Sequence, residues 1–76
     1  MKRTLLNVVR QLVDHPADVR LTEMHGATTS IYELRCHSGD VGKIIGKDGK
    51  TVSAIRTLAG VMAVRRGRKA VLEVVE

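Results

Sequence analysis

Two glycines three residues apart, Gly46 and Gly49, constrain this chain most, because they separate two segments with helical periodicity. Apolar residues recur at helical spacing on both sides: Val41, Ile44 and Ile45 before the pair, and Val52, Ile55, Leu58 or Ala59, and Met62 after it. This pattern predicts a helix, a tight glycine turn and a second helix. A ligand can approach the turn closely, because glycine has no side chain. The N–H groups that open the second helix favour an anion such as phosphate.

The positive charge of the chain is concentrated at and after this turn. Residues 40–69 contain eight Lys and Arg against two Asp, a local charge of +6, whereas the whole chain carries +5. A polyanionic partner that contacts this region is one interpretation, and a solvated basic face that maintains solubility is the other. Tyr32 is the only aromatic residue, which nearly excludes a stacking platform for nucleobases.

The rest of the sequence divides into short elements. We expect an amphipathic helix stopped by Pro16, two strands that form an antiparallel hairpin, and a short helix with Ser38 as its N-cap. A long helix then begins near Lys50 and stops at Gly67, and a last strand follows. Within the long helix, Gly60 costs about 1 kcal/mol relative to Ala, and close packing is the only reason the sequence suggests. The expected ranges are 4–13, 18–24, 31–37, 38–46, 50–66 and 70–75.

The order helix, strand, strand, helix, helix, strand predicts an α+β fold of one domain, residues 1–76. The path from the second strand through two helices is a crossover, so the last strand should lie parallel to the second. The result is a three-stranded mixed sheet covered on one face by three helices. The single cysteine, Cys36, excludes an internal disulfide, favours a cytoplasmic location and is expected to pack in the core.

The stretch at residues 41–52 resembles the signature of the KH domain, I-G-x-x-G followed by two residues and then an aliphatic residue. The element order resembles the type II KH arrangement. The whole chain is similar in length and pattern to the KhpA family, the small stand-alone KH proteins of bacteria. This resemblance implies non-enzymatic binding of single-stranded RNA, in which the loop clamps the backbone of about four nucleotides. It also implies a role as an RNA chaperone or post-transcriptional regulator, and pairing as a homodimer or with another KH-containing protein.

Carried onto this chain, the resemblance assigns roles to individual residues. Gly46 and Gly49 admit the sugar-phosphate backbone, and Lys47 faces the phosphates. Ile45 and Val52 form part of one wall of the groove that holds the bases, and the last β-strand borders its other side. Asp48 conflicts with phosphate binding, and we expect it to point away and cap the second helix. The predicted RNA-binding residues are Lys43, Ile45, Gly46, Lys47, Asp48, Gly49, Lys50, Val52 and Arg56.

The glycine turn has two other possible interpretations, a nucleotide-binding loop and a simple joint between helices. The sequence Gly49-Lys50-Thr51 resembles the end of a nucleotide-binding phosphate loop, but Ile44 stands where that motif requires glycine. A mere joint between helices would need only one glycine. A second basic cluster is either another phosphate contact or a solvated helix end; it consists of Arg65, Arg66, Arg68 and Lys69.

The sequence offers no sign of catalysis. His15, His25 and His37 lie in separate predicted turns without metal-ligand spacing, and no nucleophile–base pair is evident. We therefore predict no enzyme, metal, cofactor or small-molecule substrate, and no membrane contact. A protein-interaction module that dimerises through an aliphatic face is the alternative function. Salt dependence separates the two, since phosphate contacts weaken steeply with salt.

Overall fold

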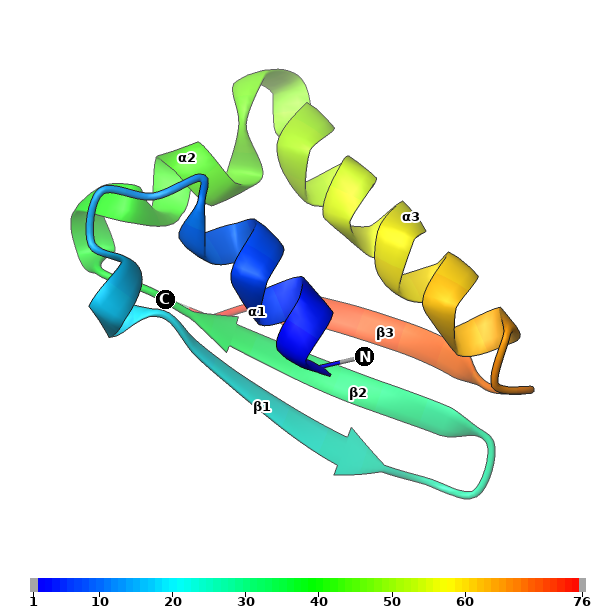
Figure 1. Cartoon of the computed structure of the whole chain (residues 1–76). Helices are drawn as coiled ribbons and strands as arrows, with labels where there is room; N and C mark the ends of the chain where they lie inside the picture. The colour runs from blue at the N-terminus through cyan, green and yellow to red at the C-terminus, as the bar shows by residue number, and fades with distance from the viewer. Residues whose placement is uncertain (1, 76) are drawn as a thin grey trace.

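The computed structural model describes residues 2–75 (Figure 1). Six elements and three short 3₁₀ turns follow one another in the predicted order. The elements are α1 (Lys2–Arg10), β1 (Arg20–His25), β2 (Thr29–Arg35), α2 (Val41–Ile45), α3 (Lys50–Val64) and β3 (Lys69–Val74). The 3₁₀ turns are Pro16–Asp18, Ser38–Asp40 and Lys47–Gly49.

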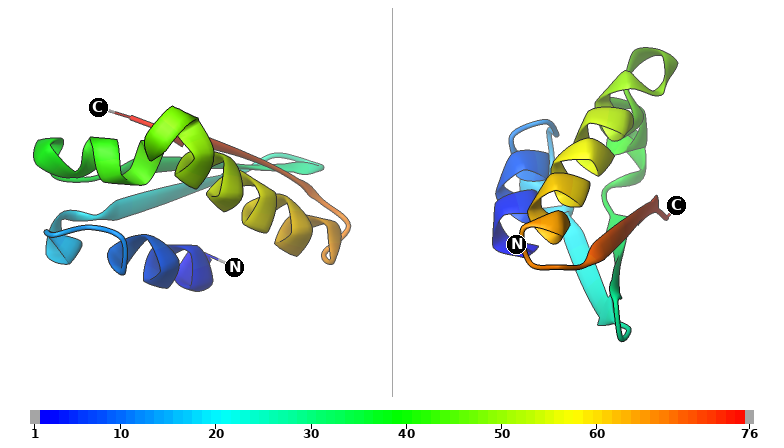
Figure 2. Two further views of the ribbon diagram at one scale, coloured as in Figure 1. Left: turned by 90° about the horizontal axis from the view of Figure 1, so that it is seen from above. Right: turned by 90° about the vertical axis from the view of Figure 1, so that its right-hand side faces the viewer.

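The three strands form one sheet in the order β1-β2-β3. β1 pairs antiparallel with β2, with Leu21 opposite Leu34, and β2 pairs parallel with β3, with Tyr32 opposite Leu72. The helices lie together on one face of this sheet (Figure 2). The predicted fold class, a type II KH arrangement with a mixed sheet covered on one face, is confirmed.

The core lies between the helices and the covered face of the sheet. Tyr32 at its centre is fully buried, and its hydroxyl donates to Glu23 Oε2 at 3.0 Å. Burial, and next the neighbouring Glu23, raise the pKa of Tyr32. The helices contribute aliphatic side chains at the spacing that the sequence shows: Leu5 and Val9 from α1, Ile44 from α2, and Val52, Ile55, Ala59 and Ala63 from α3.

Several element boundaries differ from those expected. α1 ends at Arg10 rather than at residue 13, because tighter turns follow, with the Leu12 amide bonded to the Val9 carbonyl at 3.0 Å. β2 begins at Thr29, whose carbonyl accepts from the Gly26 amide at 2.8 Å and closes a shorter hairpin turn. Cys36 follows β2 and is half-buried against the core.

The expected N-cap at Ser38 is wrong. His37 occupies the cap position instead, and its Nδ1 accepts from the Gly39 amide at 3.0 Å. The chain makes a 3₁₀ turn there before α2 begins at Val41, two residues later than a cap at Ser38 would place its first residue. No helix among residues 2–75 is long and apolar enough to cross a membrane.

Candidate nucleic-acid interface

The glycine turn between α2 and α3 forms the end of the molecule seen at the top of Figure 1. Gly46 has φ 76° and ψ 173°, a conformation open essentially only to glycine. A Cβ at Gly46 would lie 2.6 Å from Thr51 Cβ and 2.9 Å from the Thr51 backbone nitrogen. Gly46 is therefore required by packing inside the turn as well as by its backbone.

Gly49 differs from Gly46, because, its two chain neighbours apart, no atom of residues 2–75 lies within 4 Å of the position of its Cβ. Its φ of 72° is left-handed, and it is the N-cap residue of α3 without a side-chain capping bond. Asp48 also has a positive φ, 57°, is exposed and makes no capping bond to α3. The expected capping role of Asp48 is wrong, since this left-handed backbone places the chain in a further tight turn. A free carboxylate therefore remains at the turn.

The lysines around the turn are in different environments. Lys47 and Lys50 are exposed at the turn and at the first residue of α3. Lys43 is bound within the protein: its Nζ lies 3.2 Å from Asp14 Oδ2 and 3.9 Å from Asp40 Oδ1. The ion pair with Asp14 joins α2 to the connection between α1 and β1, so Lys43 is the least available of these three predicted phosphate ligands.

Arg56 links α3 to the edge strand of the sheet. Its Nε donates to the Leu72 carbonyl of β3 at 3.1 Å, while the residue as a whole is exposed. The two aliphatic residues predicted to form a groove wall, Ile45 and Val52, differ in burial. Val52 is only 5% exposed and belongs to the core, whereas Ile45 is half-buried at its margin.

The second basic cluster lies at the opposite end of α3 from the turn, about 22 Å away at 1.5 Å per residue (Figure 1). Within it, Arg68 is engaged by the β1–β2 hairpin. Its Nη2 donates to the carbonyls of Gly26 at 2.8 Å and Thr29 at 3.1 Å, and its Nε donates to Ser30 Oγ at 3.0 Å. Arg65, Arg66 and Lys69 are exposed around it. Arg68 thus acts in the fold.

The structure brings together two histidines that the sequence places in separate turns. The rings of His15 and His37 stack with centroids 3.9 Å apart and planes 17° from parallel. His15 Nδ1 lies 3.1 Å from Oδ2 of the buried Asp40. The three side chains have ligand atoms within 4.8 Å of one another, which the sequence analysis missed. Because imidazole lone pairs lie in the ring plane, two stacked rings do not direct them at a common point, and the cluster is built as a hydrogen-bonded brace.

Asp40 is the centre of this brace. The amides of His15 and Asp14 donate to its carboxylate at 2.9 and 3.3 Å. Burial alone would raise the pKa of Asp40, but these amides and the His15 imidazole outweigh it and hold that pKa below its usual value. Asp40 directly precedes α2, so the brace holds the α1–β1 connection against the start of the helix that leads into the glycine turn.

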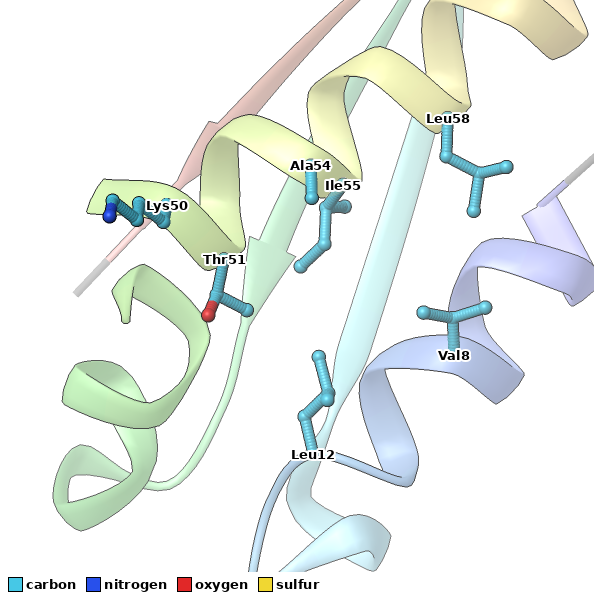
Figure 3. A pocket seen from close by; sticks show the side chains of 7 residues that line it. All are labelled: Val8, Leu12, Lys50, Thr51, Ala54, Ile55 and Leu58. Carbon is cyan, nitrogen blue, oxygen red and sulfur yellow. The ribbon is translucent and has the colours of Figure 1, made fainter. Parts of the chain in front are cut away.

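An apolar groove of about 390 Å³ runs between α1 and α3 (Figure 3). Val8 of α1 and Leu12, two residues beyond its end, point across it toward Ile55 and Leu58 of α3, and Lys50 lies at one end. Thr51 lines the groove and also packs beneath Gly46. The groove therefore begins directly behind the glycine turn.

Comparison with known proteins agrees with the fold. Residues 2–74 match the family model described as KhpA/KhpB, KH domain. The chain is 50% identical to the RNA-binding protein KhpA of Chlamydia muridarum, over 100% of this chain and 97% of that protein. It is 38% identical to the RNA-binding protein KhpA of Listeria monocytogenes, over the full length of both, and 37% identical to that of Clostridium perfringens, over 99% of this chain and all of the relative. No solved structure matches the chain significantly. The chain belongs to the KhpA/KhpB family of KH domains.

Proposed function

We propose that this protein binds single-stranded RNA through the turn at Gly46–Gly49, without catalysing a reaction. The observation that carries the proposal is the open backbone at Gly49, where no described residue other than its chain neighbours comes within 4 Å of the Cβ position, beside exposed Lys47 and Lys50. Backbone N–H groups at a helix start and two ammonium groups match a phosphate chain. The relatives named RNA-binding protein KhpA support the same function.

In this proposal the glycine turn holds the RNA backbone, and the surface along α3 contacts the bases. A phosphate lies against Gly49, with the Lys47 and Lys50 ammonium groups on either side of it. The following nucleotides run along α3 between Ile45 and the edge strand β3, where Arg56 is exposed. Bases without aromatic partners are recognised there by hydrogen bonds and aliphatic contacts. Binding of this kind suits an RNA chaperone or post-transcriptional regulator.

The test is fluorescence anisotropy of a labelled single-stranded RNA pool, titrated at two salt concentrations. Lys47→Asp should abolish most of the binding and reduce the dependence on salt, because a phosphate contact is replaced by repulsion. Arg3→Asp is the matched control: it changes the net charge equally, but on α1 near its start. Circular dichroism checks that both variants fold. Equal affinity of wild type and Lys47→Asp would contradict the proposal.

We also propose that the chain pairs through its α1–α3 face, with a second copy of itself or with another KH-containing protein. The apolar groove supports this, together with Val61, which is 56% exposed on α3. Val61→Glu should shift a dimer to monomer in sedimentation velocity. Val71→Glu on β3, 45% exposed in the wild type, is the control that should not. A wild-type chain that stays monomeric up to high concentration leaves only the mixed pair, which affinity capture with a KH-containing partner then tests.

A further inference from the structure

Gly60 has no structural reason to be glycine. It lies inside α3, where glycine is the least favourable residue after proline, and its φ is not left-handed. Apart from the helix's own backbone, no atom lies within 4 Å of a Cβ built there, so the close packing expected from the sequence is absent. A residue that weakens its helix and fills no internal contact leaves space on the surface for something else.

The open space at Gly60 lies on the side of α3 that borders β3. Gly60 follows Arg56 by four residues, so the two are neighbours on one face of the helix. The Arg56 side chain marks the direction of that face, because its Nε reaches the Leu72 carbonyl of β3. The same face leads back to Gly49 at the start of the helix, seven residues before Arg56. The glycine turn, Arg56 and Gly60 therefore share one stripe.

Arg56 is held in position with most of its donors free. The bond from Nε to Leu72 fixes the plane of the guanidinium, and no other hydrogen bond or ion pair joins its side chain to residues 2–75. Arginine planes are a common surface on which unstacked RNA bases lie, and the terminal N–H groups bond to base edges. Any side chain at position 60 would stand one turn away and cover this surface.

We infer that a nucleobase of the bound strand packs against the bare backbone at Gly60 and lies on the anchored guanidinium of Arg56. This inference rests on the proposed RNA-binding function and assigns its base-contacting end. The turn holds a phosphate, and the base lies further along α3. Glycine at position 60 thus allows the ligand to approach the helix closely.

The test compares Gly60→Gln with Thr57→Gln, which adds the same side chain on the exposed face of the same helix. RNA anisotropy is measured at several salt concentrations and the thermal midpoint by circular dichroism. We expect Gly60→Gln to fold with an unchanged or higher midpoint and to raise the Kd at least about tenfold, with the salt slope unchanged, because a base contact releases no counterion. Thr57→Gln should stay within about twofold of wild type. Gly60→Ala should raise the midpoint by roughly 4–8 °C.

Each outcome decides the inference. Gly60→Gln binding within about twofold of wild type overturns it, as does a salt slope lowered by a full phosphate contact, since the strand's backbone would then lie there. A lower midpoint for Gly60→Ala also overturns it, because the glycine would be needed for packing. If Lys47→Asp loses binding and Gly60→Gln does not, only this inference fails. If neither variant changes binding, the proposed function fails with it.

Discussion

The two glycines of the turn should respond differently to the same substitution, although the sequence treats them alike. Gly46→Ala places a methyl group 2.6 Å from Thr51 Cβ and 2.9 Å from a backbone nitrogen, at φ 76° and ψ 173°. The backbone conformation costs about 1–3 kcal/mol and the overlap about another 1–3 kcal/mol. Gly49→Ala meets no atom within 4 Å, so only its left-handed φ is penalised, by about 1–2 kcal/mol.

Urea unfolding followed by circular dichroism measures the difference. A chain of 76 residues has a free energy of unfolding of roughly 4–11 kcal/mol, so the loss of about 2–6 kcal/mol expected for Gly46→Ala removes a large share of it and should lower the urea midpoint strongly. Gly49→Ala should remain folded and show weaker RNA binding. Adding Thr51→Ala to Gly46→Ala should restore only part of the stability, because the Thr51 Cβ and backbone stay in place. Equal losses for the two glycine variants would refute the packing argument.

Three further predictions concern charged residues. Asp48→Asn keeps a residue that tolerates left-handed backbone and removes the carboxylate, so RNA affinity should rise about threefold to tenfold in anisotropy, and an unchanged affinity would contradict a phosphate at the turn. Arg68→Ala should lower the free energy of unfolding by about 1–3 kcal/mol, with RNA binding unchanged, since its guanidinium bonds to the hairpin; a loss of affinity with unchanged stability would assign it to RNA instead. Asp40 has a lowered pKa, so it stabilises the fold above the unfolded value of 3.8, and this stabilisation is lost as pH falls from that value through the lowered folded pKa. Asp40→Asn should flatten acid unfolding curves below about pH 4, and parallel curves would exclude the brace as the cause.

The sequence predicts the elements and their order because the periodicity of apolar residues is a local property. Leu5 and Val9, for example, recur at helical spacing and are both buried. The glycine turn is equally local, so its position between two helices could be read directly. The predicted boundaries were wrong where short-range hydrogen bonding competes with periodicity. This happens at the end of α1 and at His37, whose side chain replaces Ser38 as cap.

What the sequence could not reveal are contacts between distant segments. His15 meets Asp40 across 25 residues, and Arg68 reaches Gly26 across 42. From the sequence, Lys43 is one more cation near the turn, but in the fold it forms an ion pair with Asp14. Each of these depends on how two connections pack, and no spacing within either segment records it. The structure therefore revised the predicted roles of charged residues more than it revised the predicted fold.

The position of β3 has a consequence for when the protein becomes functional. β3 is the parallel neighbour of β2, and its Leu72 carbonyl fixes Arg56 beside the proposed path of the RNA. A chain in which residues 69–74 have not yet joined the sheet already contains the glycine turn and both its helices, but leaves β2 as an open edge and Arg56 unanchored. In the proposed function, Arg56 is fixed for base contact only when the sheet closes, so a partly folded chain would hold a phosphate at the turn before it could discriminate between bases.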